Sequence, residues 1–453
     1  MKCTRLLPKE ARRIGIVGLG RSNLSLLELL PKEAVYVLRS DGRVRREDIP
    51  KDIRVGGIFE GKAALSDITE DALILSPSVR RSRPELLSAL GDGVILSSDA
   101  EIFFENVSAP VLAVSGSSGK STTATLAHMM LGGERCGAVL AGNVGTPMTS
   151  TLRLDGRVYV CELSSFMLEY HRATVRRSVL TGITENHLDW HGSFDEYREA
   201  KLKLFALSGE FVANVDDKVL GEHCRGRGIY GAVSLSDSLG ELVTRQSAEV
   251  YMTFENGWLT RNGERLLHES ELLRRERHNI ANMLCALALV DGFCDRECAL
   301  DALRRFGGLV HRGRTVCEAG GVKYIDSSID TTPERCVVTL SSIEGRGILL
   351  LGGRGKGLSY DGLARGVSRF ARLVITFGEE RERLRLALCD SIPTVSCERL
   401  RDAVFAACAE ARRGEAVVLS PACTSYDEFG SFEERGELFE KWVSEYVSEN
   451  KEK

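Results

Sequence analysis

The sequence APVLAVSGSSGKSTTATLAHMM, residues 109–130, joins a predicted strand, a loop of small residues and a predicted helix. The apolar, β-branched run Val111–Val114 predicts a buried strand, and the apolar spacing after Ser121 predicts a helix. Lys120 stands where the loop meets the helix. Small residues let successive backbone N–H groups converge on an anion, while the helix N-terminus and the lysine add positive charge. The stretch therefore predicts a binding loop for the phosphates of a nucleoside triphosphate.

The loop departs from the generic pattern GxxxxGK[ST], which would need glycine where Val114 stands. It keeps the shorter pattern G-x-x-G-K-S-T, in which the hydroxyls after the lysine offer an oxygen to a phosphate-bound magnesium ion. On this stretch alone, a plain connection between a strand and a helix remains an open interpretation. The candidate nucleotide-binding residues are Gly116, Ser117, Ser118, Gly119, Lys120, Ser121 and Thr122.

The composition narrows the class of protein. A length of 453 residues predicts two to four domains. The 60 basic and 64 acidic residues nearly balance, which argues against a dedicated nucleic-acid or membrane-surface protein. No stretch is long and apolar enough to cross a bilayer, and the thirteen cysteines are scattered. We therefore expect a cytoplasmic monomer with reduced thiols, without membrane insertion and without a nucleic-acid partner.

The first segment, residues 1–107, predicts a small parallel sheet. A buried strand runs into Gly18-x-Gly20 and an apolar helix, but Asn23 replaces the third glycine of the dinucleotide fingerprint. This partial fingerprint favours a phosphate-bearing ligand more than NAD. Arg39 follows the second strand, where it either meets a diphosphate or is an exposed loop arginine. Further strands are predicted at Val35–Leu38, Leu73–Leu75 and Val94–Leu96.

The second segment, residues 108–307, gathers polar residues at the ends of predicted strands. Glu162 stands near the end of the strand Val158–Leu163, where a magnesium ligand is expected beside a phosphate loop. His187 and His191 are four residues apart, but the glutamate of HExxH is missing, so we set a zinc protease aside. Other predicted elements are a helix at Glu196–Phe205, hairpin turns at Asn256-Gly and Asn262-Gly, and an apolar helix at Arg277–Val290.

The third segment, residues 308–453, predicts a second doubly wound sheet. Its strands are expected at Val322–Ile325, Ile348–Leu351, Leu373–Phe377 and Ala416–Leu419. The loops Gly352–Gly357 and Ser420–Phe429 follow the second and the last of these strands. Open α/β sheets bind ligands at the carboxyl ends of their strands, so both loops are candidate ligand-binding loops.

Eight motifs in this order resemble those of the Mur ligase family. They are SGSSGKSTT at 115–123, GNVGTP at 142–147, CELSSF at 161–166, ITENHLDWHGSFDEYREAKLKLF at 183–205, RHNIANMLCALAL at 277–289, LVHR at 309–312, LLGGRGKG at 350–357 and LSPACTSYDEFGSFEERGELF at 419–439. The resemblance covers nearly the whole chain. It implies an α/β fold of three domains, namely a Rossmann-like UDP-binding domain at 1–107, a P-loop-type ATPase domain at 108–307 and a Rossmann-like amino-acid-binding domain at 308–453.

The resemblance also implies the reaction and the residues that perform it. ATP and Mg²⁺ would drive an amide ligation in peptidoglycan precursor synthesis, adding D-glutamate to UDP-N-acetylmuramoyl-L-alanine through an acyl phosphate. The implied catalytic residues are Lys120, His187, Lys201 and Lys356. The first magnesium ion would take Ser121 and Glu162, and the second would take His187 and a carbamylated Lys201. The implied nucleotide ligands beyond the loop are Asn279, Asn282, Arg312 and Asp326. The muramoyl substrate would meet Asn143 and Ser164, and D-glutamate would meet Lys356, Ser425 and Phe432.

Some positions depart from the family pattern. Asn186 replaces an aspartate, Glu276 a glycine and Met167 a glutamine, while Ser328 and Asp330 replace the lysine and threonine of D-S-K-A-T. A ligase for a different amino acid therefore stays open, as does a nucleotide-binding homologue with reduced catalysis. A relative of folylpolyglutamate synthase is disfavoured by the motif SPACTSYDEF, and an NAD oxidoreductase would rest on Gly18-x-Gly20 alone.

Overall fold

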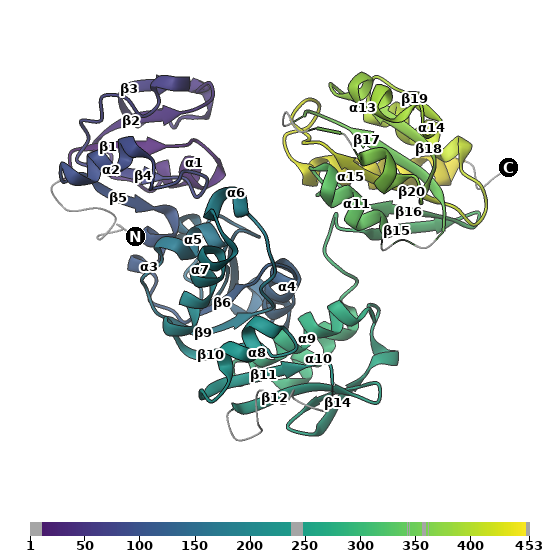
Figure 1. Cartoon of the computed structure of the whole chain (residues 1–453), viewed down its shortest axis with the longest axis horizontal. Coiled ribbons are helices and arrows are strands. Elements are labelled where there is room, and N and C mark those ends of the chain that lie inside the picture. Colours follow the sequence, from purple (N-terminus) through teal and green to yellow (C-terminus); the bar gives the residue numbers. More distant parts are fainter. Residues whose placement is uncertain are drawn as a thin grey trace. The chain divides into compact units, whose positions relative to one another are not determined.

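The computed structural model of the chain describes residues 11–449, except 237–247, 342, 344, 356–358 and 361. The chain divides into two compact units, Met1–Phe306 and Gly307–Lys453 (Figure 1). The first unit holds a five-stranded and a nine-stranded sheet, and the second holds a six-stranded sheet. The mixed α/β architecture with three sheets agrees with the predicted fold class. In the part of the chain that the structure describes, no helix has the length and apolar character needed to cross a membrane.

The N-terminal sheet is parallel and has the strand order β3-β2-β1-β4-β5. Its strands are β1 (Arg13–Val17), β2 (Val35–Ser40), β3 (Arg54–Glu60), β4 (Ala72–Leu75) and β5 (Ile95–Ser98), with helices α1 (Arg21–Leu27), α2 (Pro84–Gly91) and α3 (Asp99–Asn106) and short 3-10 turns at Arg46–Asp48 and Gly61–Ala63. Four of these strands were predicted. The edge strand β3 was missed because it contains two adjacent glycines and is largely exposed.

Both predicted roles of Arg39 are wrong. Its side chain is fully buried rather than exposed, and its guanidinium donates to both carboxylate oxygens of Glu70 at 2.8 and 3.0 Å. A further N–H group donates to the carbonyls of Ala64 and Ser66. Its donors are therefore used inside the domain, where they close the segment after β3 against the sheet, and they are not available to a diphosphate.

The central sheet has the order β14-β13-β12-β11-β10-β9-β6-β8-β7. Its strands are β6 (Val111–Ser115), β7 (Ala138–Gly142), β8 (Val158–Glu162), β9 (Val175–Leu180), β10 (Ser208–Asn214), β11 (Ile229–Ser234), β12 (Ala248–Glu255), β13 (Trp258–Arg261) and β14 (Glu264–His268). Its helices are α4 (Lys120–Met130), α5 (Ser165–Tyr170), α6 (Leu188–His191), α7 (Phe194–Ala206), α8 (Lys218–Cys224), α9 (Arg277–Val290) and α10 (Arg296–Arg305), with 3-10 turns at Gly133–Cys136, Thr149–Arg153 and Glu269–Glu271.

The predicted hairpins and the apolar helix of this sheet are confirmed. Asn256 and Asn262 have φ of 49° and 51°, and the glycine after each also has a positive φ, which is the backbone of a tight hairpin turn. These turns connect the antiparallel strands β12, β13 and β14. Helix α9 is buried along most of its length, so its apolar run reflects packing on every side.

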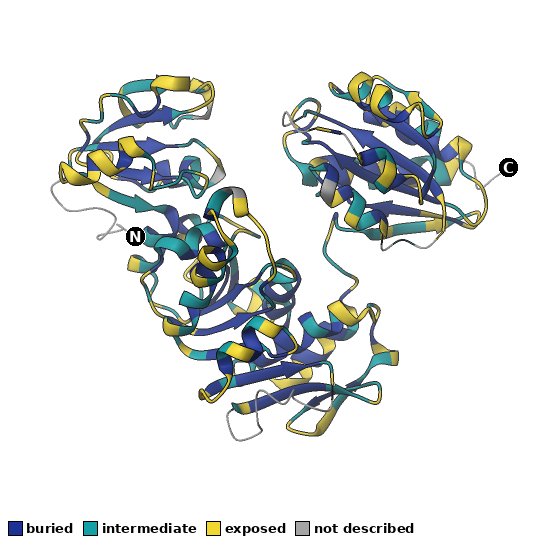
Figure 2. Ribbon diagram, viewed as in Figure 1, coloured by how far each residue is buried: buried dark blue, intermediate teal, exposed yellow. Residues whose placement is uncertain are grey.

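The second unit has the strand order β15-β16-β20-β17-β18-β19, in which only the pair β15–β16 is antiparallel. Its strands are β15 (Arg314–Ala319), β16 (Val322–Asp326), β17 (Gly347–Gly352), β18 (Ala371–Phe377), β19 (Thr394–Ser396) and β20 (Ala416–Ala422). Its helices are α11 (Pro333–Ser341), α12 (Leu363–Val367), α13 (Arg381–Leu388), α14 (Leu400–Glu410) and α15 (Phe432–Glu449). Apolar clusters cover both faces of the sheet, whose central strands are buried (Figure 2).

Candidate active site

The phosphate loop connects the end of β6 to the start of α4. Gly116 has φ of 143° and Gly119 has φ of 81°, a region that favours glycine. A Cβ atom at Gly116 would collide with the hydroxyl of Thr181, and one at Gly119 would collide with the side-chain amide of Asn282. The loop is therefore fitted closely between the end of β9 and helix α9, which explains why both positions are glycine.

Hydrogen bonds hold this loop in one shape. The Ser117 N–H donates to the Gly182 carbonyl at 2.8 Å, and the Ser117 hydroxyl lies 2.9 Å from the Thr184 carbonyl and 2.8 Å from the hydroxyl of Tyr197. The backbone amide of Ser117 is thus used within the protein. The amides of the first turn of α4, which have no carbonyl one turn earlier in the helix, are left to face an anion. The ammonium of Lys120 donates to the carbonyl of Ser117 at 3.1 Å and so stays over the loop.

Glu162 provides a buried carboxylate beside the loop. It ends β8, whose register with β6 pairs it with Val114, and its side chain is fully buried. One oxygen accepts a hydrogen bond from the Asn143 amide at 2.8 Å, whereas Oε2 is buried without a hydrogen-bond partner among the described residues. Because buried polar atoms are normally partnered, this oxygen marks a place for a ligand. A carboxylate oxygen next to bound phosphates fits Mg²⁺.

Lys201 lies under the same loop, on α7. It is 1% exposed, and its amine donates to the carbonyl of Gly116 at 2.8 Å and lies 3.4 Å from the hydroxyl of Ser115. Burial, helped by the charge of Lys120, holds the pKa of Lys201 well below its usual value, against the opposing effect of Glu162. This amine is therefore far more often neutral, and so nucleophilic, than a surface lysine.

His187 and His191 have different environments. His187 is exposed, has φ of 52° and precedes the four-residue helix α6, and its ring lies 4.9 Å from that of Phe166. His191 is 5% exposed and packs between the rings of Phe166 and Tyr197. Only His187 is therefore accessible to a ligand. The side-chain carbonyl of Asn186 accepts a hydrogen bond from the His187 N–H at 2.9 Å.

Two further predicted residues of this unit lie on helix α9, and one caps helix α5. Asn282 is 7% exposed and lies against Gly119, while Asn279 is one turn nearer the helix start and donates to Glu276 at 3.0 Å. The Ser164 hydroxyl accepts from the Met167 N–H at 3.2 Å as the N-cap of α5. The first unit thus brings together Asn143, Glu162, Lys201 and Asn282 around the loop that carries Ser118, Lys120, Ser121 and Thr122.

The second unit places its predicted residues at the carboxyl ends of parallel strands. Asp326 ends β16, where one carboxylate oxygen accepts from the Ser328 N–H at 2.9 Å and the other contacts His311. Burial opposes protonation of His311, but the hydrogen bond and charge of Asp326 outweigh it and raise the pKa of the imidazole. Arg312 follows His311. Ser425 is buried after β20 and Phe432 begins α15, whereas Lys356 lies outside the described residues.

Comparison of the chain with known proteins identifies its family. Residues 114–290 match the model of the Mur ligase middle domain. A protein of Pseudomonas putida named UDP-N-acetylmuramoylalanine–D-glutamate ligase is 35% identical, over 96% of this chain and 97% of its own length. One of the same name from Nitrosococcus oceani is 33% identical, over 98% and 99%. The chain belongs to the Mur ligase family. A solved structure of UDP-N-acetylmuramate–alanine ligase from Thermotoga maritima has the same fold, with a TM-score of 0.58 at 17% identity, over 97% of this chain and 100% of that one.

In this Mur ligase, Ser328 and Asp330, which replace the lysine and threonine of the family motif, direct their side chains into the protein. The Ser328 hydroxyl donates to the Phe432 carbonyl at 2.8 Å and accepts from the guanidinium of Arg435 at 2.9 Å. Asp330 is 4% exposed and accepts from the hydroxyl of Ser420 at 2.8 Å. Burial raises the pKa of the Asp330 carboxyl, which the hydroxyls around it counteract in part. Neither side chain is presented at the surface of the unit as a charged group.

Arg435 is a residue that the sequence did not single out. It is fully buried, and its guanidinium donates to the carbonyls of Ser328 at 2.8 Å and Cys423 at 3.1 Å. Burial lowers the pKa of Arg435 to about 10. The arginine ties the start of α15 to the loops after β16 and β20, which carry Ser425 and Phe432. In the sequence it is one of many charges in EERGELFEK, and its position within the motif at 419–439 is the one signal that could have identified it.

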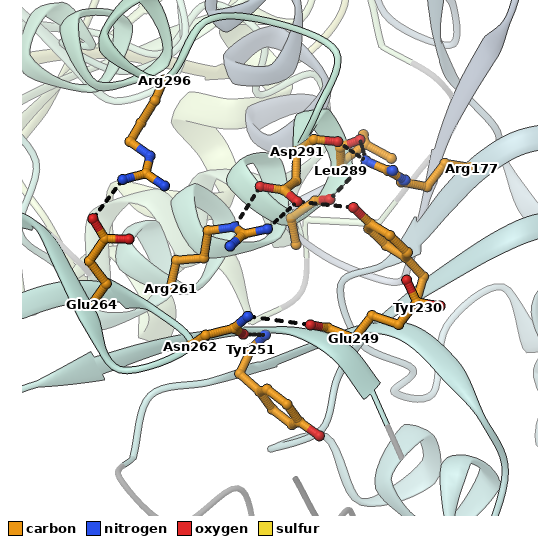
Figure 3. Close-up of polar contacts among 11 residues, drawn as sticks. Arg177, Tyr230, Glu249, Tyr251, Arg261, Asn262, Glu264, Leu289, Asp291 and Arg296 are labelled. Atoms are coloured by element: carbon orange, nitrogen blue, oxygen red, sulfur yellow. Dashed lines mark hydrogen bonds and ion pairs between the residues drawn. The ribbon is translucent and has the colours of Figure 1, made fainter. Parts of the chain in front are cut away.

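Helix α9 of the Mur ligase is held at its carboxyl end by a polar network (Figure 3). Arg177 is 3% exposed and donates to the carbonyls of Leu289 at 3.0 Å and Asp291 at 2.6 Å, at the carboxyl end of the helix. The Asp291 carboxylate accepts from the hydroxyl of Tyr230 at 3.0 Å and from two N–H groups of Arg261 at 2.8 and 2.9 Å. These residues belong to β9, β11 and β13, so three strands fix one end of the helix.

Replacing Arg177 with methionine is expected to lower the free energy of unfolding by about 3 kcal/mol, because breaking a buried ion pair leaves its partners uncompensated. The methionine keeps the length of the side chain, but the carbonyls at the end of α9 lose their donor and the Glu210 carboxylate loses one of its two arginine partners. Denaturant unfolding of the full chain measures the change. Arg176→Met is the matched control, because Arg176 also pairs with Glu210 but is 51% exposed, and it should cost less than about 1 kcal/mol. Equal losses would contradict the buried role of Arg177.

Proposed function

We propose that this Mur ligase adds D-glutamate to UDP-N-acetylmuramoyl-L-alanine, using ATP and releasing ADP and phosphate. The observation that carries the proposal is the group formed by Lys120, Glu162 and Lys201 around one glycine loop, with a carboxylate oxygen that has no hydrogen-bond partner among the described residues. The substrate assignment is supported by curated relatives named UDP-N-acetylmuramoylalanine–D-glutamate ligase, which are 30–35% identical over nearly the whole chain.

Residues of the first unit would hold the triphosphate and its metal. The first turn of α4 and Lys120 would bind the phosphates, and Asn279 and Asn282 the adenine. Ser121 and Glu162 would hold one Mg²⁺, and His187 with a carbamylated Lys201 would hold a second. Carbamylation joins the neutral amine to carbon dioxide with loss of one proton, which gives the buried lysine an anionic oxygen. When bound, the metal ions neutralise charge on the transferring phosphoryl group.

The chemistry explains why charge and position are what the protein must supply. A carboxylate is a poor acyl donor, so the substrate carboxylate attacks the γ-phosphate of ATP, the bond to the β-phosphate oxygen breaks, ADP leaves, and an acyl phosphate forms. The amine of D-glutamate then displaces phosphate to form the amide. Both steps gather negative charge, which Lys120 counters beside the loop. The fixed shape of the loop means that its N–H groups need little rearrangement when the phosphates arrive.

The remaining substrate contacts are proposed residue by residue. Asn143 and Ser164 would meet the muramoyl peptide, and Arg312 and Asp326 would meet the nucleotide from the second unit. Ser425, Phe432 and Lys356 would hold D-glutamate within residues 308–453, and the UDP group would bind within residues 1–107. The inward hydrogen bonds of Ser328 and Asp330 support glutamate, because neither side chain presents a carboxylate that would repel it.

Phosphate release tests the proposal. The purified chain, Mg²⁺ and ATP are mixed with UDP-N-acetylmuramoyl-L-alanine and with D-glutamate, L-glutamate, D-lysine or L-lysine in turn. Release that requires both the UDP substrate and D-glutamate is expected. Release with another amino acid would assign a ligase of altered specificity. No release with any amino acid, together with retained ATP binding, would favour the homologue with reduced catalysis, for which Asn186 is the specific observation.

A further inference from the structure

Glu276 makes an unusual contact at the start of helix α9. It is the N-cap residue of the helix, yet its carboxylate makes no capping bond to the described amides of the first turn. Instead, Oε2 accepts a hydrogen bond from the side-chain Nδ2 of Asn279 at 3.0 Å. The backbone supports this pairing, since the Asn279 N–H donates to the Glu276 carbonyl at 2.8 Å. The acidic side chain is therefore directed at one particular amide group.

This contact fixes which way the Asn279 amide points. An asparagine amide has a donor side and an acceptor side that are nearly equal in shape and that exchange by rotation about one bond. An ionised carboxylate only accepts, so Nδ2 must face Glu276, and the reverse orientation would bring two acceptors together. The Oδ1 atom then points away from Glu276, and no bond to it is found among the described residues. The side of Asn279 turned away from Glu276 therefore carries the acceptor Oδ1.

The carboxylate of Glu276 is ionised in neutral solution. Partial burial acts to raise its pKa, but the hydrogen bond from Asn279 and the nearby charge of Arg274 outweigh it, so the pKa lies below its usual value. The guanidinium of Arg274 lies 3.4 Å from the other carboxylate oxygen, Oε1. Arg274, Glu276 and Asn279 therefore form a chain in which each donor is matched to an acceptor, and this chain sets the orientation of the amide at its end.

We propose that Glu276 is a positioning residue that selects the base of the nucleotide, because it turns the acceptor of Asn279 toward the purine edge. A 6-amino purine donates to that acceptor, whereas a 6-oxo purine sets a carbonyl against it. The inference rests on the proposed function in one respect, that the start of α9 meets the purine. Beyond that function, it assigns the choice between a 6-amino and a 6-oxo purine to Glu276, a side chain that need not touch the base.

The selectivity follows from hydrogen-bond complementarity. When a ligand places an acceptor against an acceptor of the protein, both groups lose their hydrogen bonds to water and gain none. A site with such an acceptor therefore rejects the wrong ligand much more strongly than a site that lacks it. Without Glu276, the Asn279 amide is free to rotate and to donate through Nδ2 to a 6-oxo group. Removing the carboxylate should therefore improve binding of the 6-oxo nucleotide and slightly weaken binding of ATP. The ratio of the two affinities is the quantity that reports the role.

The experiment measures the dissociation constants of Mg·ATP and Mg·ITP for the full chain and for Glu276→Ala, Glu276→Gln and Glu297→Ala. ITP differs from ATP at the 6-position and at the adjacent ring nitrogen, and it lacks the 2-amino group of GTP. We expect the preference for ATP to fall by about tenfold in Glu276→Ala, the size of one matched hydrogen bond, and by less in Glu276→Gln, whose amide can accept or donate. Glu297→Ala removes an exposed carboxylate from the first turn of α10 and should keep the preference of the unmodified chain.

The outcomes separate this inference from the proposed function. An unmodified chain that prefers ATP, with the same preference in Glu276→Ala, would overturn the inference and leave the proposed function intact. An equal loss of affinity for both nucleotides in Glu276→Ala would also overturn it, since that is the result of a merely structural role. An unmodified chain that binds neither nucleotide would overturn the proposed function and the inference together. Phosphate release with each nucleotide provides a second readout of the same ratio.

Discussion

Lys120→Ala is expected to lower ATP turnover by about a hundredfold to a thousandfold, the cost typical of removing one preorganised group that stabilises developing negative charge. The lysine begins α4 and its ammonium is held over the loop by the Ser117 carbonyl. Its side chain is only half-buried, so the free energy of unfolding should change by less than about 1 kcal/mol. Phosphate release and denaturant unfolding, measured on the same preparation, separate the two effects.

Lys218→Ala is the matched control for this prediction. Lys218 is also the first residue of a helix in the same unit, α8, but it is exposed. Its loss should leave turnover within about twofold of the unmodified chain, because an exposed charge is screened by solvent. Full turnover in Lys120→Ala would show that the glycine loop is a structural connection, which is the interpretation that the sequence of this stretch left open.

Local pattern predicted the elements of the fold well where one physical effect dominated. The asparagine–glycine pairs at 256 and 262 predicted hairpins because their backbone conformation is strongly favoured there, and the structure has both turns. The apolar run that follows Arg277 predicted a helix, which is found over Arg277–Val290. The edge strand Arg54–Glu60 lacks such a signal, because most of its residues are exposed and it pairs with β2 alone.

Long-range partners could not be read from the sequence. Arg39 and Glu70 are 31 residues apart, and nothing local shows that the arginine is buried against that carboxylate. Arg435 reaches Ser328 across 107 residues, and its neighbours in the sequence suggest a solvated helix face. The identity of these residues is visible in the sequence, but their burial is decided by tertiary packing.

The candidate site could be predicted in part, because its residues show a local pattern but their partners depend on tertiary packing. The spacing of Tyr197 and Lys201 places both on one face of a helix, and the structure shows the amine 5.0 Å from the tyrosine ring. That the amine reaches the carbonyl of Gly116 depends on how α7 packs under the loop. The bond between Glu276 and Asn279 was equally hidden, because a side chain's hydrogen-bond partner is not set by sequence distance alone.

Lys201→Met is the second change with a large expected effect, and it should separate activity from stability. Turnover should fall by about a thousandfold, because the amine that the proposed second metal site requires is gone. Stability should change by no more than about 1–2 kcal/mol, since methionine fills the space of the lysine stem and only the hydrogen bonds of the amine to the Gly116 carbonyl and the Ser115 hydroxyl are lost. Lys203→Met is the matched control, because Lys203 lies on the same helix as Lys201 and its amine also donates to a backbone carbonyl, that of Glu169 on α5, at 2.9 Å. It should retain most of the turnover.

The stability difference between Lys201→Met and the unmodified chain should also depend on pH, in a direction that follows from the lowered pKa of Lys201. Burial lowers the pKa of Lys201 in the folded chain, so between that pKa and the usual lysine value the unfolded chain binds more protons. The buried amine therefore costs most at low pH, and its cost disappears as the pH rises through this window. In bicarbonate-free solution, the stability of Lys201→Met relative to the unmodified chain should increase as the pH falls. Added bicarbonate should raise turnover of the unmodified chain alone, and a bicarbonate response in the methionine variant would rule out Lys201 as the carbamylated residue.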